Sequence, residues 1–216
     1  MYKSVATSYS SRPVDVESSF LRGAPQSSTP ITASRVDFTK TPLSQRGAAY
    51  AVVLDGVLTP EECAQLTAYA EASSTKQTSA ESTDSAERGW TAALVNAGPG
   101  REVLAPDYRN SQRIIWDGQD MMDRLWARVI QAQGVKDDLE WLDATSGGAK
   151  KPWTEAVLGG AAKKSKWREP EKWKFTRLNE RMRFLRYEPG MFFRGAYFVL
   201  IKWNDHPDAM ALLRTL

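Results

Sequence analysis

The chain has 216 residues, 29 Lys and Arg residues against 26 Asp and Glu residues, and a formal net charge of +3. This length suits one domain with a tail, and so small a charge excess does not by itself indicate a nucleic-acid-binding protein. Cys63 is the single cysteine, which excludes an intrachain disulfide and a cysteine-based zinc site. No apolar run approaches the roughly 20 residues that a membrane helix needs. We therefore predict a cytoplasmic or nuclear protein without a membrane partner.

Residues 1–46 are dominated by Ser, Thr, Pro and charged side chains. A segment of this composition cannot bury enough apolar surface to offset the entropy lost when it is ordered. The composition therefore predicts a disordered tail over residues 1–46 and a folded domain over residues 47–216.

The domain is predicted to open with a strand followed by a helix. Residues 50–54 form a short apolar run that is typical of a buried strand, and a turn follows at residues 55–56. Thr59 can cap a helix, Pro60 suits the first helical position, and Glu62 completes a capping box. The spacing of apolar residues after Pro60 predicts that the helix continues to about residue 72.

The middle of the chain predicts two strands and an amphipathic helix. We expect a loop over residues 73–88, a strand near Trp90 and a second strand over residues 111–116. A helix is expected over residues 119–132 because apolar residues recur there at helical spacing. These residues are Met121, Met122, Leu125, Val129 and Ile130.

Residues 134–175 contain pairs of glycines, pairs of lysines and four tryptophans, and predict a basic, Trp-rich insertion with one or two short helices. Residues 181–193 predict a hairpin with its turn at Pro189 and Gly190. A further strand is expected over residues 196–203, and a short helix is expected to begin near Met210.

Three stretches resemble the N-terminal part of Fe(II)/2-oxoglutarate-dependent oxygenases of the prolyl 4-hydroxylase-like group. They are YAVVLDGVLTPEECAQLTAYAEA, DYRNSQRIIWDGQDMMDRLWARV and LNERMRFLRYEPGMFFRG, of which the last is the most specific. They cover roughly residues 50–132 and 178–195. The resemblance implies an α+β fold, namely a partial double-stranded β-helix (jelly roll) with flanking N-terminal helices.

The same resemblance implies the cofactors Fe(II) and 2-oxoglutarate and, by the same analogy, ascorbate, in the hydroxylation of a C–H bond. In the family, an H-x-D pair and a distal histidine bind the iron and leave three positions open for the co-substrate and O₂. A tyrosine at the position of Tyr187 can reach the 2-oxoglutarate carboxylate, so Tyr187 is our candidate cofactor-binding residue. The alternative role of Tyr187 is that of an aromatic residue in the core of a barrel.

The sequence departs from the family pattern at the metal motif. The metal-binding His and Asp would fall at Ala196 and Phe198, which cannot ligate iron. His206, the single histidine, has H-x-D spacing with Asp208, but the family site requires two histidines. We assign no catalytic residue and no metal ligand, and we expect the oxygenase-like domain to be incomplete at its C-terminus and inactive as this chain. One hypothesis is that the residues after Gly195 arise from a retained intron, a frameshift or a missed exon.

Two alternatives stay open. Residues 163–186 interleave ten Lys and Arg residues with Trp167, Trp173 and Phe175, so a nucleic-acid-binding module could neutralise phosphates and stack bases there. We favour a solvated basic insertion whose tryptophans pack onto the domain, because no RNA-binding signature accompanies the stretch. The other alternative is a non-catalytic interaction protein that associates with itself through exposed strand edges, with residues 196–203 most exposed to pairing.

Overall fold

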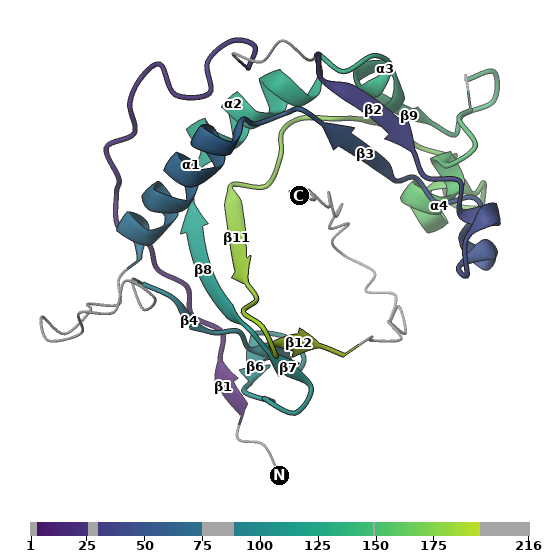
Figure 1. Ribbon diagram of the computed structural model, residues 1–216. Coiled ribbons are helices and arrows are strands. Elements are labelled where there is room, and N and C mark those ends of the chain that lie inside the picture. The colour runs from purple at the N-terminus through teal and green to yellow at the C-terminus, as the bar shows by residue number, and fades with distance from the viewer. Residues whose placement is uncertain (1–3, 26–29, 75–88, 149, 195–216) are drawn as a thin grey trace, which may run out of the picture. The chain divides into compact units, whose positions relative to one another are not determined.

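The computed structural model describes residues 4–25, 30–74, 89–148 and 150–194. These residues form a mixed α+β structure with four α-helices and several small antiparallel sheets, and the described strands do not close a barrel (Figure 1). The chain divides into two compact units. Of the described residues, the first unit comprises 4–22, 60–74, 89–122 and 179–194, and the second comprises 23–25, 30–59, 123–148 and 150–178.

The first unit is built on a three-stranded antiparallel sheet. Its central strand is β8 (Gln112–Asp117), which lies between β11 (Arg181–Arg186) and the short β4 (Thr91–Ala92). β11 and β8 pair over six residues, from Arg181 opposite Asp117 to Arg186 opposite Gln112. Because side chains alternate along a strand, this register places Ile114, Trp116 and Met182 on one face, where all three are buried.

Helix α1 (Pro60–Ser73) packs against β8 in the first unit (Figure 1). The predicted start at Pro60 is confirmed, and Leu66 and Ala70 are buried on the helix face. The Tyr69 ring lies 6.5 Å from the Trp116 ring, centroid to centroid. Burial of these apolar groups supplies the main driving force for attaching the helix to the sheet.

The other strands of the first unit are short. One antiparallel sheet has the order β1-β6-β5, and a separate pair joins β12 to β7. Their bounds are β1 Ser4–Ala6, β5 Val95–Asn96, β6 Arg101–Val103, β7 Arg109–Asn110 and β12 Phe192–Phe193.

The predicted hairpin over residues 181–193 is wrong in its pairing. The turn exists, with Gly190 at a φ of +84° and the Met191 N–H donating to the Glu188 carbonyl at 2.9 Å. However, β11 pairs with β8 and β12 pairs with β7, so the two strands flanking the turn do not pair with each other. The six-residue pairing of β11 with β8 buries Met182. An isolated two-stranded hairpin would leave this side chain in water.

The second unit contains two strand pairs. β2 (Thr32–Arg35) pairs with β3 (Val52–Asp55), and the connection between them carries the short 3-10 helices η1 (Phe38–Lys40) and η2 (Ser44–Arg46). β3 confirms the strand predicted near residues 50–54. The second pair joins β9 (Trp141–Asp143) to β10 (Lys172–Lys174).

Helix α2 (Gln119–Val129) begins in the first unit and ends in the second, which confirms the amphipathic helix but ends it three residues early. Val129 packs with Val57, Ala132 and Val135 in a core of the second unit. Trp126 stacks on Phe175 at 4.2 Å between ring centroids. The insertion, for which one or two short helices were expected, contains α3 (Val135–Leu139) and α4 (Thr154–Leu158), and η4 (Gly159–Ala162) follows α4.

The N-terminal residues differ from the predicted disordered tail. Within the first unit, β1 pairs with β6, and Phe20 and Leu21 are buried, with the Phe20 ring 5.2 Å from the Tyr69 ring. Within the second unit, β2 pairs with β3. The composition of residues 1–46 did not reveal this order because the partners of these few apolar and strand residues lie elsewhere in the chain.

The strand expected over residues 196–203 and the helix expected from Met210 lie outside the described residues, as does most of the loop expected over residues 73–88. Among the helices that the structure describes, none has the length and apolar character that crossing a bilayer requires.

Candidate functional site

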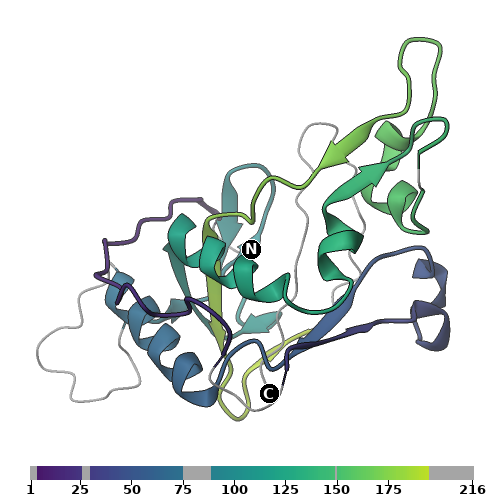
Figure 2. The same ribbon diagram turned by 90° about the horizontal axis from the view of Figure 1, so that it is seen from above.

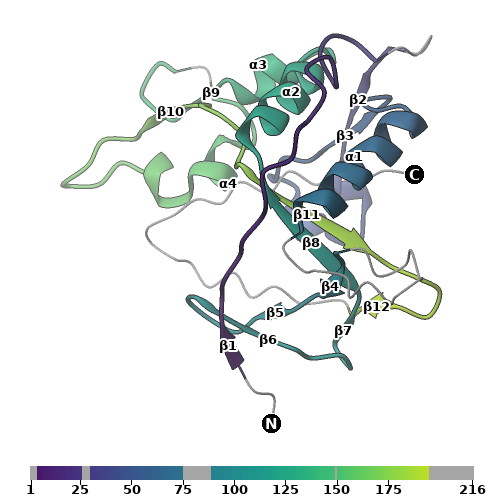
Figure 3. The ribbon, with the colours of Figure 1, turned by 90° about the vertical axis from the view of Figure 1, so that its left-hand side faces the viewer.

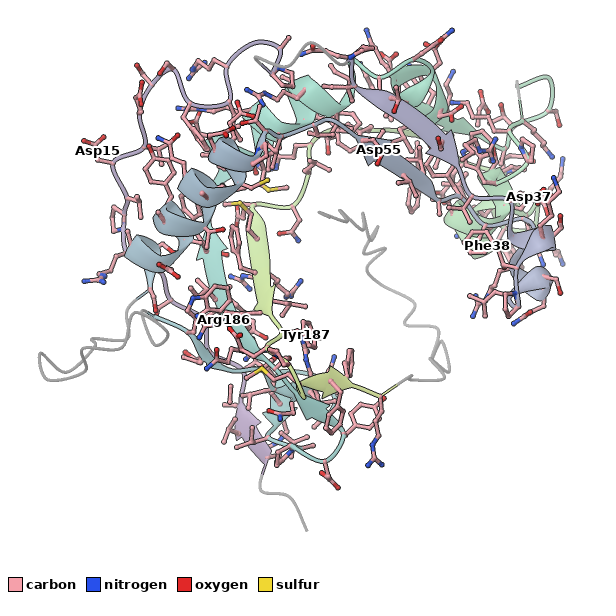
Figure 4. All side chains as sticks on the ribbon, in the orientation of Figure 1. Asp15, Asp37, Phe38, Asp55, Arg186 and Tyr187 are labelled. Carbon is pink, nitrogen blue, oxygen red and sulfur yellow. The ribbon has the colours of Figure 1, made fainter. Side chains whose placement is uncertain are left out.

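The two faces of β11 differ in their surroundings. Met182 is buried on the α1 side of the sheet, and Phe184 stacks there with Trp116 at 6.5 Å between ring centroids. On the other face, Leu185 is 46% exposed, and Tyr187, just beyond the end of the strand, is 45% exposed. Figure 4 shows Arg186 and Tyr187 on opposite sides of the chain at this end of β11. Tyr187 is therefore a half-exposed residue at the end of β11 and is not a core aromatic in the described structure.

Arg186 fixes the chain immediately before Tyr187. Its Nε donates to Gln112 Oε1 at 2.8 Å, and its guanidinium lies 4.9 Å from the centre of the Trp90 ring. It also forms a 3.5 Å ion pair with Glu188. The Arg186 side chain is half-buried between these partners. Among the described residues, the Tyr187 hydroxyl has no hydrogen-bond partner.

A buried polar cluster joins the N-terminal segment to the sheet of the first unit. Glu102, on β6, is buried and accepts two hydrogen bonds from Arg113, at 2.8 Å and 2.7 Å. The Tyr9 hydroxyl donates to the same carboxylate at 2.6 Å. These hydrogen bonds hold the pKa of Glu102 below its usual value, and burial raises the pKa of Tyr9. The Glu102 carboxylate is thus satisfied by both partners.

A second ion pair lies close to the same tyrosine. Arg181 donates to both carboxylate oxygens of Asp117, at 2.7 Å and 2.6 Å, and these bonds lower the pKa of Asp117. The guanidiniums of Arg181 and Arg113 lie 4.8 Å and 5.4 Å from the centre of the Tyr9 ring. Figure 3 shows the N-terminal segment passing in front of β8, the strand that carries Arg113 and Asp117.

This cluster is built for stability rather than for proton transfer. The pKa values of Glu102 and Asp117 are both lowered by paired guanidiniums, whereas a general acid or base at neutral pH needs a pKa near 7. By register, Arg113 lies beside Leu185 and Asp117 beside Arg181, on the same sheet face as Tyr187. On this face, the phenol hydroxyl of Tyr187 is therefore a polar group that is exposed and has no hydrogen-bond partner among the described residues.

This chain does not supply the two histidines and one carboxylate that a family-type iron site requires. The described residues hold no group of three His, Cys, Asp or Glu side chains placed to bind a metal ion. The positions expected for the metal motif, Ala196 and Phe198, lie outside the described residues, and so do His206 and Asp208. With one histidine in 216 residues, two histidine ligands cannot come from a single copy of this chain.

A cavity of about 330 Å³ lies in the first unit beside the N-terminal segment. Its wall includes Arg12, Trp116, Asp117, Asp120 and Met121. Its two carboxylates are already engaged, Asp117 by Arg181 and Asp120 by Arg22 at 3.6 Å. The cavity therefore offers no free acidic pair for catalysis or metal binding within the described residues.

The basic stretch over residues 163–186 is divided between the two units. Residues 163–174 belong to the second unit, whereas Arg181, Arg183 and Arg186 lie on β11 in the first. Trp173 packs against the core around Leu158 in the second unit, as the favoured interpretation requires. Trp167 does not pack in this way, because it is 86% exposed.

No family model, no curated protein and no solved structure matches the chain.

Sequence reasoning did not find the cluster around Tyr9 and Glu102. The two residues are 93 positions apart, and Tyr9 lies in a segment that composition assigned to a tail. The only local signal was the alternation of charged and apolar residues near Glu102, between Arg101 and Val103. This alternating stretch is too short to show whether the glutamate is buried or exposed.

Proposed function

We propose that this chain is a non-catalytic relative of the Fe(II)/2-oxoglutarate-dependent dioxygenases, in which the open face of β11 binds 2-oxoglutarate weakly through Tyr187. The observation that carries the proposal is the placement of Tyr187, exposed at the end of a strand whose opposite face packs toward α1. A phenol hydroxyl in this position is a suitable donor to a carboxylate. The proposal also rests on the resemblance of LNERMRFLRYEPGMFFRG to the family strand that precedes the metal motif.

The proposal excludes turnover by this chain alone. Hydroxylation in the family requires iron held by two histidines and one carboxylate, and this chain contains one histidine. The two carboxylates near the open face, Glu102 and Asp117, are engaged by Arg113 and Arg181. We therefore assign no oxidative step to the described residues.

The test is an anaerobic titration of the full chain with Fe(II) in the presence of 2-oxoglutarate, read by the metal-to-ligand charge-transfer absorbance. We expect no stoichiometric absorbance and no decarboxylation of 2-oxoglutarate after oxygen is admitted. A band that saturates at one iron per chain would show that residues such as His206 and Asp208 form a metal site, and would refute the non-catalytic assignment.

Ligand binding is measured separately, without metal. Saturation-transfer NMR should detect weak binding of 2-oxoglutarate to the wild-type chain. A hydrogen bond to a charged group contributes about 1.5–3 kcal/mol, so Tyr187→Phe should weaken binding by roughly 10-fold or more. Tyr108→Phe is the matched control, because Tyr108 is a partly buried tyrosine of the same unit whose ring packs edge-on against Phe193. Equal binding by wild type and Tyr187→Phe would remove Tyr187 from the proposal.

A second candidate function is protein interaction through the same region. Four large apolar or aromatic side chains between residues 185 and 193 are exposed by 37–46%. They are Leu185, Tyr187, Phe192 and Phe193. Size-exclusion chromatography with light scattering over a range of concentrations distinguishes this candidate, since self-association through these residues would be reduced by Leu185→Ser.

A further inference from the structure

A small hairpin projects between η4 and β10 in the second unit (Figure 2). Its base is fixed by a hydrogen bond from the Glu171 N–H to the Ala161 carbonyl at 2.9 Å, and Ala161 is buried in a core with Leu158. Its tip is closed by Ser165 and Arg168, whose Ser165 N–H donates to the Arg168 carbonyl at 2.8 Å. Lys166 and Trp167 therefore occupy the two central positions of the turn.

Trp167 is 86% exposed, which is unusual for the largest apolar side chain. The neighbouring Lys166 ammonium lies 5.0 Å from the centre of its ring. Its neighbours along the chain at the tip are the polar or charged residues Ser165, Lys166 and Arg168, and its 86% exposure leaves the indole largely uncovered. An aromatic side chain held out on an anchored turn is available to stack on a flat partner.

A second exposed tryptophan lies on the β9–β10 pair of the same unit. The register places Trp141 opposite Lys174, and Trp141 is 39% exposed. The ammonium groups of Lys172 and Lys174 lie 4.7 Å and 5.2 Å from the centre of its ring. On the opposite face of the strand, Trp173 packs against the core, so alternation separates a structural tryptophan from one on a basic surface.

Positive charge surrounds these two aromatic rings. Residues 163–174 contain six Lys and Arg residues and two glutamates. Lys163, Lys166 and Lys174 have no carboxylate partner among the residues that the structure describes. The ion pairs of this region are Lys164 with Glu169, Arg168 with Glu171 and Lys172 with Asp143.

We propose that this surface, formed by the 163–171 hairpin and the Trp141 face of β9–β10, binds single-stranded nucleic acid. Lysine ammoniums would neutralise phosphates, and the indoles would stack on unpaired bases, which requires no sequence signature. An acidic peptide would use the lysines but leave the exposed Trp167 without a partner. A lipid bilayer is a poorer match because the neighbours of Trp167 at the tip are polar or charged.

The test is fluorescence anisotropy of a labelled oligothymidine of about 15 nucleotides with the full chain, at salt concentrations from about 50 to about 200 mM. We expect binding with a dissociation constant of about 1–100 µM that weakens as salt rises, and weaker binding to a duplex of the same length. Absence of binding to the single strand at the lowest salt would overturn the proposal. Binding to phosphatidylserine vesicles or polyglutamate without binding to the oligonucleotide would also overturn it.

Variants at the tip separate stacking from charge. Trp167→Ala should weaken binding about 5- to 100-fold, and Trp167→Phe should retain most of the affinity because a flat ring remains. The double variant Lys163→Glu/Lys166→Glu should weaken binding and reduce its salt dependence. Lys40→Glu/Lys136→Glu carries the same charge change at exposed positions of the second unit and should have a much smaller effect. Wild-type affinity in Trp167→Ala would refute the stacking role.

Discussion

The hydroxyl of Tyr9 donates a 2.6 Å hydrogen bond to Glu102, which joins two residues 93 positions apart in the sequence. Glu102 in turn accepts two hydrogen bonds from Arg113 on β8. The N-terminal segment is thus bound to the central sheet of the first unit through a buried carboxylate.

This relationship predicts that Tyr9→Phe destabilises the protein. The substitution removes a hydrogen bond to a charged, buried acceptor, so the free energy of unfolding should fall by about 1.5–3 kcal/mol. Urea denaturation followed by circular dichroism measures the change. Tyr108→Phe, in the same unit, should change stability by less than about 0.5 kcal/mol. A loss no larger in Tyr9→Phe than in Tyr108→Phe would show that the N-terminal segment does not contribute to folding.

The same carboxylate predicts acid sensitivity. The hydrogen bonds from Arg113 hold the pKa of Glu102 lower in the folded state than in the unfolded chain. The stabilisation is therefore complete above the unfolded value of about 4.3 and is lost as pH falls through the lower folded value. Asp117, paired with Arg181, adds to the loss in the same direction.

The test measures unfolding free energy against pH for wild type and Glu102→Gln. The variant should be less stable at pH 7 because Arg113 loses its charged partner, and its stability should fall less steeply below about pH 4.5. Parallel curves for the two proteins would contradict the assignment of this acid sensitivity to Glu102.

Tyr50 predicts the opposite, alkaline dependence in the second unit. Burial, together with the charge of Asp138 and the hydrogen bond to it, raises the pKa of Tyr50 to about 12. Because the pKa of Tyr50 is higher in the folded protein than in the unfolded chain, where it is about 10, protonated Tyr50 stabilises the folded state below about pH 10. This contribution is lost as the pH rises from about 10 to 12. Tyr50→Phe should remove this part of the alkaline destabilisation. Spectrophotometric titration should show one fewer late-ionising tyrosine, and an unchanged titration would exclude Tyr50 as its source.

The elements that sequence predicted well depend on local signals. Pro60 and the spacing after it define α1, and the apolar stripe from Met121 to Val129 defines α2. β3 and β8 are likewise confirmed to within two residues, because each contains consecutive apolar residues of high strand propensity and is followed directly by a glycine, Gly56 or Gly118. These patterns require no knowledge of the partner segment.

The errors concern partners distant in the sequence. Nothing within residues 181–193 indicates that β11 pairs with β8, about 70 residues earlier, in preference to β12 across a well-formed turn. The tail was misjudged for the same reason, since Tyr9 acquires its role only beside Glu102. Tyr187 is 45% exposed, and its role in binding 2-oxoglutarate stays a prediction.

The N-terminal order also predicts a large effect of Phe20→Ala. Phe20 is 6% exposed and packs edge-on against Tyr69 of α1, so truncation removes buried apolar surface and leaves a cavity. We expect a loss of about 2–4 kcal/mol in the free energy of unfolding, measured by urea denaturation. Leu43→Ala is the control, because Leu43 is an apolar residue of the same N-terminal 46 residues but is exposed, and its effect should be within about 0.5 kcal/mol. Removing a side chain that is already solvated in the folded protein leaves no cavity. Equal, small effects of the two substitutions would therefore restore the interpretation of residues 1–46 as a disordered tail.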